Sequence, residues 1–166
     1  MADSAITKKA LANALKLLIC DVPFSKISIS DICDICEMNR KSFYYHFKDK
    51  YDLVNWIFDT EFSSNAKNYD DDLLILELCR YLYINRDFYR KAFKIEGQNS
   101  FRSHFSLYVS EYISSRFQGN HGTTPNTMKV HFYSDGLVCT IERWLLSKHC
   151  TLPDDFYSLL STLNSK

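Results

Sequence analysis

Residues 28–50 read SISDICDICEMNRKSFYYHFKDK, and this stretch decides the predicted fold. Ser28 is followed three residues later by Asp31, which resembles a capping box with an aspartate in place of the usual glutamate. A short helix is therefore expected to begin at Ile29 and to end near Cys36.

A second short helix is expected directly afterwards. Asn39 can cap a helix that opens with Arg40, which leaves only residues 37–38 for the turn. Phe43 and Phe47 share one face of this helix, and that face must be buried against the apolar face of the helix before it. Two short helices that meet at an angle across so tight a turn have the pattern of a helix-turn-helix.

The other face of the second helix is basic and aromatic. Between residues 38 and 50 there are four Lys or Arg against one acid, although the whole chain has 20 residues of each sign and no net charge. Positive charge is thus concentrated where a recognition helix would enter the major groove of DNA. Arg and Lys can pair with phosphates or guanine edges, and Ser and Tyr hydroxyls can donate to phosphate oxygens. The candidate DNA-binding residues on this face are Arg40, Lys41, Ser42, Tyr44, Tyr45, His46 and Lys48, and for His46 packing beside Phe47 is an equally open role.

The rest of the chain is also predicted to form helices. No Gly or Pro occurs between Pro23 and Gly97, an interval in which strands would need turn residues. Apolar periodicity and cap residues predict further helices over residues 7–21, 50–66, 70–85, 87–95, 100–117, 126–147 and 153–164. The predicted fold is therefore all-α, with about nine helices: a three-helix helix-turn-helix head over residues 1–50 on a helical body over residues 51–166.

The composition is that of a globular protein, and we expect this protein to lie in the cytoplasm. Apolar residues make up 46% of the chain and aromatic residues 15%, so large side chains must be packed in a core. The first residues, MADSAITKKALANAL, lack the apolar region and cleavage site of a secretion signal, and no later run is long and apolar enough to span a membrane. We expect no membrane contact, and we expect the six cysteines to be reduced thiols.

The N-terminal third resembles the TetR-type (TetR/AcrR) family of transcriptional regulators. The resemblance lies in the first helix, the capped second helix and the phrase FYYHFKDKYDLV, which begins at Phe43. It implies that Arg40, Lys41, Ser42, Tyr44, Tyr45, His46 and Lys48 lie on or beside the recognition helix. It also implies that Lys50 opens the fourth helix and grips a phosphate.

One position departs from the family pattern. The family usually has glycine in the turn, where this chain has Glu37. We expect a positive φ at this position, which costs a residue with a Cβ roughly 1 kcal/mol. The carboxylate could also weaken the attraction of nearby phosphates or alter the turn.

Other functions find less support in the sequence. Cys33 and Cys36 have the spacing of a metal or redox pair, but no second Cys or His pair completes a ligand set, so we expect both to be packing residues and no metal or cofactor to be bound. The sequence contains neither a phosphate-binding glycine loop nor an HExxH motif, so we do not expect an enzyme. The alternative function is a helical protein-interaction adaptor that has lost specific DNA binding, as Glu37 and the neutral charge would allow.

The helical body over residues 51–166 is expected to bind a second subunit and an effector. Apolar residues occupy more than one face of the last two helices, and a monomer would not easily cover Val138, Ile141, Trp144, Leu145, Phe156, Leu159 and Leu160. The resemblance implies a homodimer with a four-helix interface, which suits a pseudo-palindromic DNA operator. It also implies an effector bound to the body. The phrase FYRKAFKIEGQNSFRSHF is similar, more weakly, to the DhaS-like subgroup of dihydroxyacetone-kinase regulators, so a small molecule and a protein co-regulator both remain open.

Overall fold

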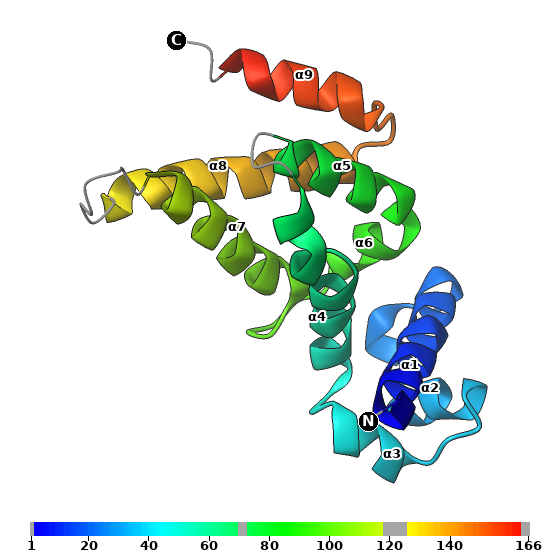
Figure 1. Ribbon diagram of the computed structural model, residues 1–166. Coiled ribbons are helices and arrows are strands. Elements are labelled where there is room, and N and C mark those ends of the chain that lie inside the picture. The colour runs from blue at the N-terminus through cyan, green and yellow to red at the C-terminus, as the bar shows by residue number, and fades with distance from the viewer. Residues whose placement is uncertain (1, 70–72, 118–125, 164–166) are drawn as a thin grey trace. The chain divides into compact units, whose positions relative to one another are not determined.

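The computed structural model describes residues 2–69, 73–117 and 126–163, and over these residues every regular element is a helix (Figure 1). The α-helices are α1 (Ala2–Asp21), α2 (Ile29–Ile35), α3 (Arg40–His46), α4 (Lys50–Glu61), α5 (Leu74–Ile84), α6 (Arg86–Ala92), α7 (Phe101–Phe117), α8 (Thr127–Leu146) and α9 (Pro153–Leu163). Two short 3-10 segments, η1 (Phe24–Lys26) and η2 (Ser63–Asn68), follow α1 and α4. The all-α prediction with about nine helices is confirmed for the described part of the chain.

The cap residues begin the short helices where the sequence predicts. The Ser28 hydroxyl accepts a hydrogen bond from the Asp31 N–H at 3.1 Å, and the Asp31 carboxylate accepts one from the Ser28 N–H at 2.7 Å. This reciprocal capping box starts α2 at Ile29. The Asn39 side chain accepts from the Ser42 N–H at 2.9 Å and starts α3.

Helix α4 ends earlier than expected. The sequence pattern predicts that it continues to about residue 66, but it ends at Glu61 and the chain tightens into η2. The reason is local competition for carbonyl groups: the Ser64 hydroxyl donates to the Thr60 carbonyl at 2.9 Å, and the Asn65 amide donates to the same carbonyl at 3.3 Å. The expected start of the next helix at Asp70 lies outside the described residues, which show α5 from Leu74.

The first of two packing units comprises Met1–Asn65 with Asp87–Phe101. Its core joins apolar residues of α1, α2, α3 and α4, with fully buried side chains that include Leu11, Leu15, Ile32, Phe43, Leu53 and Ile57. Helix α6 joins this core through aromatic rings: Phe58 of α4 contacts Phe101 with ring centroids 5.6 Å apart, and Tyr89 contacts Phe101 at 5.0 Å. The helix-turn-helix is therefore set on a rigid apolar base.

The second unit comprises Ala66–Arg86 with Arg102–Lys166. Here α5 packs against α8 and α9, and the Trp144 ring is sandwiched between Tyr83, at 6.1 Å, and Phe156, at 4.4 Å. Helices α7 and α8 run antiparallel, because Arg102 at the start of α7 pairs with Glu142 near the end of α8, and Phe117 at the end of α7 contacts Tyr133. These contacts form a second core.

The second core corrects one expectation about uncovered apolar residues. Five of the seven residues that a single chain was expected to leave uncovered are buried within this unit, namely Val138, Ile141, Trp144, Leu145 and Phe156. The reason is that α5 packs against both α8 and α9 and covers them. Of that set only Leu159 is strongly exposed, at 65%. Helix α8 instead exposes Met128 and Phe132, which the sequence pattern did not single out.

Two further expectations concern the whole chain. Among the described residues, no helix combines the length and the apolar character that crossing a membrane requires. The packing units do not test the division of roles at residue 50, which stays a prediction.

Candidate nucleic-acid interface

Helix α3 has one buried face and one exposed face. Phe43 is fully buried and Phe47, directly after the helix, is 3% exposed. The opposite face carries the residues that the sequence selects: Arg40, Lys41, Tyr44, Tyr45 and Lys48 are exposed, whereas Ser42 and His46 are half-buried. Tyr45 protrudes furthest, with 83% of its surface exposed. The structure thus brings these seven residues together on and just after one short helix.

Packing from three other helices holds α3 in this orientation. Phe47 meets Trp56 of α4 edge to face with ring centroids 5.5 Å apart, and the Lys8 ammonium of α1 lies 5.8 Å from each of these two rings. The buried thiol of Cys33 in α2 donates to the carbonyl of Asn39, the cap of α3, at 3.7 Å. The sequence analysis did not predict this role of Lys8, because Lys8 contacts residues about forty positions further along the chain, which no local pattern reveals.

The exposed aromatic side chains contact their neighbours. The Arg40 guanidinium donates to the Tyr44 hydroxyl at 3.3 Å, and its central carbon lies 5.8 Å from the Tyr44 ring. This hydrogen bond raises the pKa of Arg40 from its ordinary value. Tyr45 and His46 meet edge to face at 4.9 Å. His46 also lies 6.4 Å from the Phe47 ring, so it touches both the exposed and the buried side of the helix end.

Lys50 lies apart from this exposed face. Its ammonium donates to the carbonyl of Phe24 at 2.6 Å and to the carbonyl of Ile27 at 2.7 Å, with a longer contact of 3.5 Å to that of Ser25. It also stands 4.5 Å from the centroid of the Phe24 ring. Desolvation lowers the pKa of this ammonium from its ordinary value. Lys50 therefore joins the start of α4 to the segment between α1 and α2, an arrangement that we call the Lys50 clamp.

The turn between α2 and α3 is a Schellman motif. The Met38 N–H donates to the Cys33 carbonyl at 2.9 Å, and the Glu37 N–H donates to the Asp34 carbonyl at 3.2 Å. This pair of bonds requires a left-handed residue at position 37, and Glu37 has φ 53°. The expectation of a positive φ at this non-glycine residue is confirmed.

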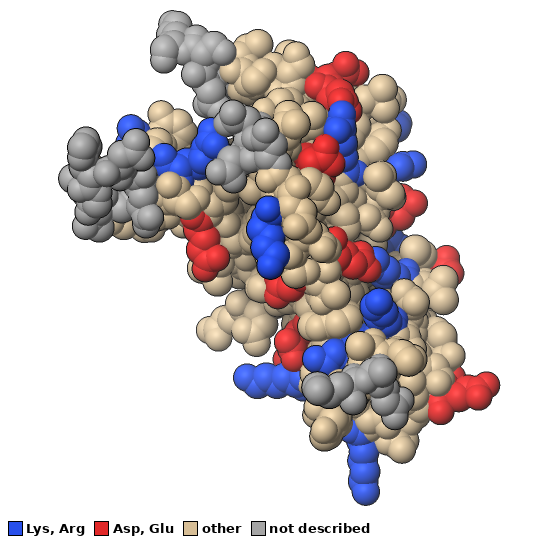
Figure 2. All heavy atoms as spheres, viewed as in Figure 1, with Lys and Arg blue, Asp and Glu red and all other residues tan. Residues whose placement is uncertain are grey.

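Acidic and basic residues occupy different parts of the helix-turn-helix motif. Figure 2 shows Lys and Arg interspersed with Asp and Glu over the face that it presents, without one continuous basic surface. Within the motif the exposed acids Asp31, Asp34 and Glu37 belong to α2 and the turn, whereas the exposed cations Arg40, Lys41 and Lys48 belong to α3 and the residues after it. The positive charge that could meet DNA is therefore concentrated at α3. Cys33 is buried and Cys36 half-buried, as expected of packing residues.

A capped two-helix motif with a buried apolar face, an exposed basic face and a tight turn defines the class of helix-turn-helix proteins. The comparisons with known proteins identify the family. Residues 10–57 match the family "Bacterial regulatory proteins, tetR family", and residues 72–166 match the family described as "Transcriptional regulator C-terminal region" of the TetR type. The chain belongs to the TetR family of bacterial transcriptional regulators, which confirms the resemblance and the prediction of a regulator in place of an enzyme.

Individual relatives agree with this assignment. The "HTH-type dhaKLM operon transcriptional activator DhaS" of Lactococcus lactis is 36% identical over 100 residues, which cover 58% of this chain and 54% of that protein. The chain thus matches about half the length of this curated relative. A solved "Dihydroxyacetone kinase operon activator DhaS" has a TM-score of 0.70 at 21% identity, covering 97% of this chain and 96% of that one. A TetR transcriptional regulator from Streptococcus agalactiae has a TM-score of 0.74 at 17% identity, covering 99% and 97%. These two structures show the shared fold.

Proposed function

We propose that this protein regulates transcription in the cytoplasm by binding a pseudo-palindromic site in double-stranded DNA through α3, as a homodimer. The observation that carries the proposal is the exposed basic and aromatic face of α3, held by the buried Phe43, in a chain without net charge. A local cluster of cations on a helix of this size suits the major groove, which admits one α-helix. Residues 1–50 would bind DNA, and residues 51–166 would bind the effector and the second subunit.

The exposed residues suggest a division of labour on DNA. Arg40 and Lys41 lie in the first turn of α3, where recognition helices reach base edges, so they are the candidates for guanine contacts. Lys48 lies beyond the helix, where a contact to the phosphate backbone is favoured. Tyr44, Tyr45, Ser42 and His46 supply hydroxyl and imidazole groups that can donate to phosphates. We assign Lys50 to positioning, because its ammonium donates to carbonyls.

Homodimerisation is supported by α8. Met128 and Phe132 are 79% and 75% exposed, and they are spaced so that they lie on one face of the helix. Gly136 continues that face, and a Cβ built on it would meet no atom of the described residues within 4 Å. Glycine costs roughly 1 kcal/mol in a helix interior, and the part of the chain that the structure describes offers no reason for it. A second α8 that crosses closely at Gly136 would supply both the reason for the glycine and the cover for Phe132.

The effector would act on an equilibrium between two states of the dimer. Binding in the body would alter the spacing of the two DNA-binding heads and so shift the population between DNA-competent and incompetent forms. A coupling free energy of about 1–3 kcal/mol is sufficient for such control. Both a small molecule and a protein co-regulator are compatible with this mechanism.

The test is selection from a random pool of DNA duplexes, followed by fluorescence anisotropy at several salt concentrations. The parent is compared with the double variant Tyr45→Ala, Lys48→Ala, whose two side chains are exposed and so can be removed without disturbing the core. Lys67→Ala, which removes an exposed lysine from η2, is the matched control. The proposal requires that the parent and the control select a palindromic site and that the double variant does not.

The adaptor alternative makes the opposite prediction. If neither the parent nor the control enriches any sequence, or if their affinity for DNA does not fall as salt is added, the chain is a helical interaction protein that has lost specific DNA binding.

A further inference from the structure

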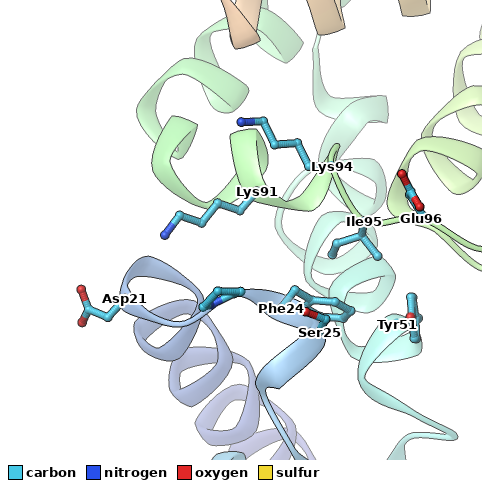
Figure 3. A pocket seen from close by; sticks show the side chains of 9 residues that line it. Asp21, Phe24, Ser25, Tyr51, Lys91, Lys94, Ile95 and Glu96 are labelled. Atoms are coloured by element: carbon cyan, nitrogen blue, oxygen red, sulfur yellow. The ribbon is translucent and has the colours of Figure 1, made fainter.

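A pocket of about 560 Å³ opens within the first unit, between η1 and the residues at and after the end of α6. Phe24 and Tyr51 form an apolar wall, and their rings meet edge to face at 5.1 Å. Figure 3 shows that the Lys94 side chain extends away from this wall. The rim carries two cations and two acids, namely Lys91, Lys94, Asp21 and Glu96. The pocket therefore favours no charge class of ligand, whereas the second unit brings together two groups of defined chemistry.

These two groups are the thiols of Cys79 and Cys150, which lie on neighbouring elements of the second unit. Cys79 belongs to α5 and is fully buried. Cys150 belongs to the irregular connection between α8 and α9 and is half-buried. Both are free thiols in the structure. Helix α5 packs against α8 and α9, so the fold brings this connection to the helix that carries Cys79.

The Trp144 ring joins the connection to α5 on the side of Cys79. It stacks on Tyr83 with ring centroids 6.1 Å apart, and its indole N–H donates to the carbonyl and the hydroxyl of Thr151, each at 3.2 Å. Tyr83 lies one turn after Cys79 on the same face of α5. Thr151 directly follows Cys150, so these contacts hold the connection near the Cys79 face.

An ion pair joins the chain to α5 on the other side of the connection. Arg80, which follows Cys79, pairs with Asp154 in the first turn of α9, and its Nε lies 3.3 Å from Oδ2. The two thiols are also close enough to interact electrostatically. Burial, and to a lesser degree the Cys150 thiol, raises the pKa of Cys79 to about 12. The Cys150 segment is therefore held beside Cys79 from both sides.

The different burial of the two thiols gives them different roles. Cys150 is the one that solvent reaches, so a dissolved oxidant would react with it first. Cys79 stays protonated near neutral pH and is closed to solvent, so it would react only with a sulfur that is already beside it. Disulfides in cytosolic proteins are usually transient and serve redox sensing or catalysis.

We propose that Cys79 and Cys150 form a redox modification site, at which a hydroperoxide converts the two thiols reversibly into a disulfide between α5 and the connection before α9. The Cys150 sulfur attacks the terminal peroxide oxygen, the O–O bond breaks, and the leaving group takes the thiol proton and departs as water or an alcohol. The Cys79 sulfur then attacks the sulfenic sulfur of Cys150, and the hydroxyl takes the Cys79 proton and departs as water. The two sulfurs together lose two electrons, which the peroxide bond gains.

The site goes beyond the proposed function, because it requires neither DNA nor a second subunit. A small dithiol would reverse the modification by thiol–disulfide exchange, attacking one sulfur of the bond and becoming a disulfide itself. The experiment uses hydrogen peroxide on the full native chain, followed by blocking of the remaining thiols with N-ethylmaleimide, digestion with trypsin and mass spectrometry.

The digest reports this pair directly. Trypsin releases Cys79 in the peptide of residues 68–80 and Cys150 in the peptide of residues 149–166, and each peptide contains one cysteine. We expect these two peptides to be linked, with the mass of the pair lowered by two hydrogen atoms, and dithiothreitol to separate them. In the same chain oxidised in urea, the yield of this link should fall about fivefold, because six cysteines then pair at random.

Two variants complete the test. Cys150→Ser should abolish the link and leave the buried Cys79 reduced. Cys139→Ser removes an exposed thiol from α8 of the same unit and is the matched control, so the yield of the link should not change. The site is overturned if the native parent gives no linked peptides, if native and urea-treated chains give equal yields, or if Cys150 links to Cys139 instead. The native parent needs no substitution, so a variant that fails to fold does not affect this result.

Discussion

At the scale of single residues, Lys50 shows how a motif position acquires its role from its surroundings. The family resemblance implies a lysine that grips a phosphate, but here two carbonyls lie within 2.7 Å of the ammonium. Hydrogen bonds from a charged donor contribute more than neutral ones, and breaking them to reach DNA has a cost. The clamp therefore favours a positioning role.

The dependence of DNA affinity on salt separates the two roles. Lys48→Ala should reduce the slope of log affinity against log salt by about 1.8, because each of the two subunits of the dimer loses one phosphate contact. Lys50→Ala should leave the slope unchanged and lower the free energy of unfolding by about 2 kcal/mol, because the clamp is lost. Anisotropy titrations and urea unfolding measure these effects. Equal losses of slope in both variants would show that Lys50 leaves the carbonyls and binds phosphate.

Glu37 gives a prediction about strain. Its φ of 53° is required by the Schellman motif, and a Cβ in this conformation costs about 1 kcal/mol. Glu37→Gly should therefore raise the free energy of unfolding by up to about 1 kcal/mol, measured as a higher urea midpoint. Glu37→Ala is the control, because it removes the same charge and keeps the Cβ. A similar gain in both variants would assign the effect to charge and contradict strain as its cause.

At the scale of helices, the tie between α5 and α9 depends on ionisation. Both the Nε and the Nη2 of Arg80 donate to the Asp154 carboxylate, and Nη1 donates to Glu77 at 2.7 Å. The hydrogen bonds with Arg80 lower the pKa of Asp154 from its ordinary value of 3.8. This contribution to stability is fully present above the ordinary pKa and is lost as the pH falls through the lowered value.

Removing the guanidinium tests this tie. Arg80→Gln should raise the pKa of Asp154 toward its ordinary value, which carbon-13 NMR of the carboxyl group measures directly. The stability difference between parent and variant should be largest near neutral pH, should begin to shrink as the pH falls below about 3.8, where Asp154 of the unfolded chain is protonated, and should be lost once the pH falls through the lowered pKa of the folded state. Glu77→Gln is the control, since it removes the partner within α5 and should leave the pKa of Asp154 low. An unchanged pKa in Arg80→Gln would contradict the tie.

At the scale of the whole molecule, the exposed apolar face of α8 predicts the oligomeric state. The parent should elute as a dimer, with a light-scattering mass of twice 19.5 kDa. Phe132→Glu should give a monomer, because it places a charge in the proposed interface. Leu107→Glu is the matched control, since Leu107 of α7 is also strongly exposed, at 66%, and lies outside that face. A monomeric parent, or a dimer that survives Phe132→Glu, would contradict pairing through α8.

The sequence predicted much of the fold because the deciding signals are local. The capping residues Ser28 and Asn39 act within three residues of themselves, and each starts its helix at the predicted position. The exposed face of α3 followed from the burial of Phe43 and Phe47 in the same way. The predicted end of α4 was wrong, because Ser64 and Asn65 compete for the last carbonyls of the helix and so override the apolar pattern.

The sequence by itself determined that the described chain is helical, where α2, α3 and α4 begin, and that positive charge is concentrated at Arg40, Lys41 and Lys48, since each depends on residues within a turn or two of one another. The start of α1 was predicted at residue 7, but the helix begins at Ala2. Tertiary structure alone decided which apolar residues are covered and what Lys50 contacts. Trp144 is buried because Tyr83 and Phe156 pack on its two faces, and Lys50 is clamped because η1 brings carbonyls to it. Such contacts join residues that are far apart in the chain, and no local sequence pattern predicts which distant residue will contact a given side chain.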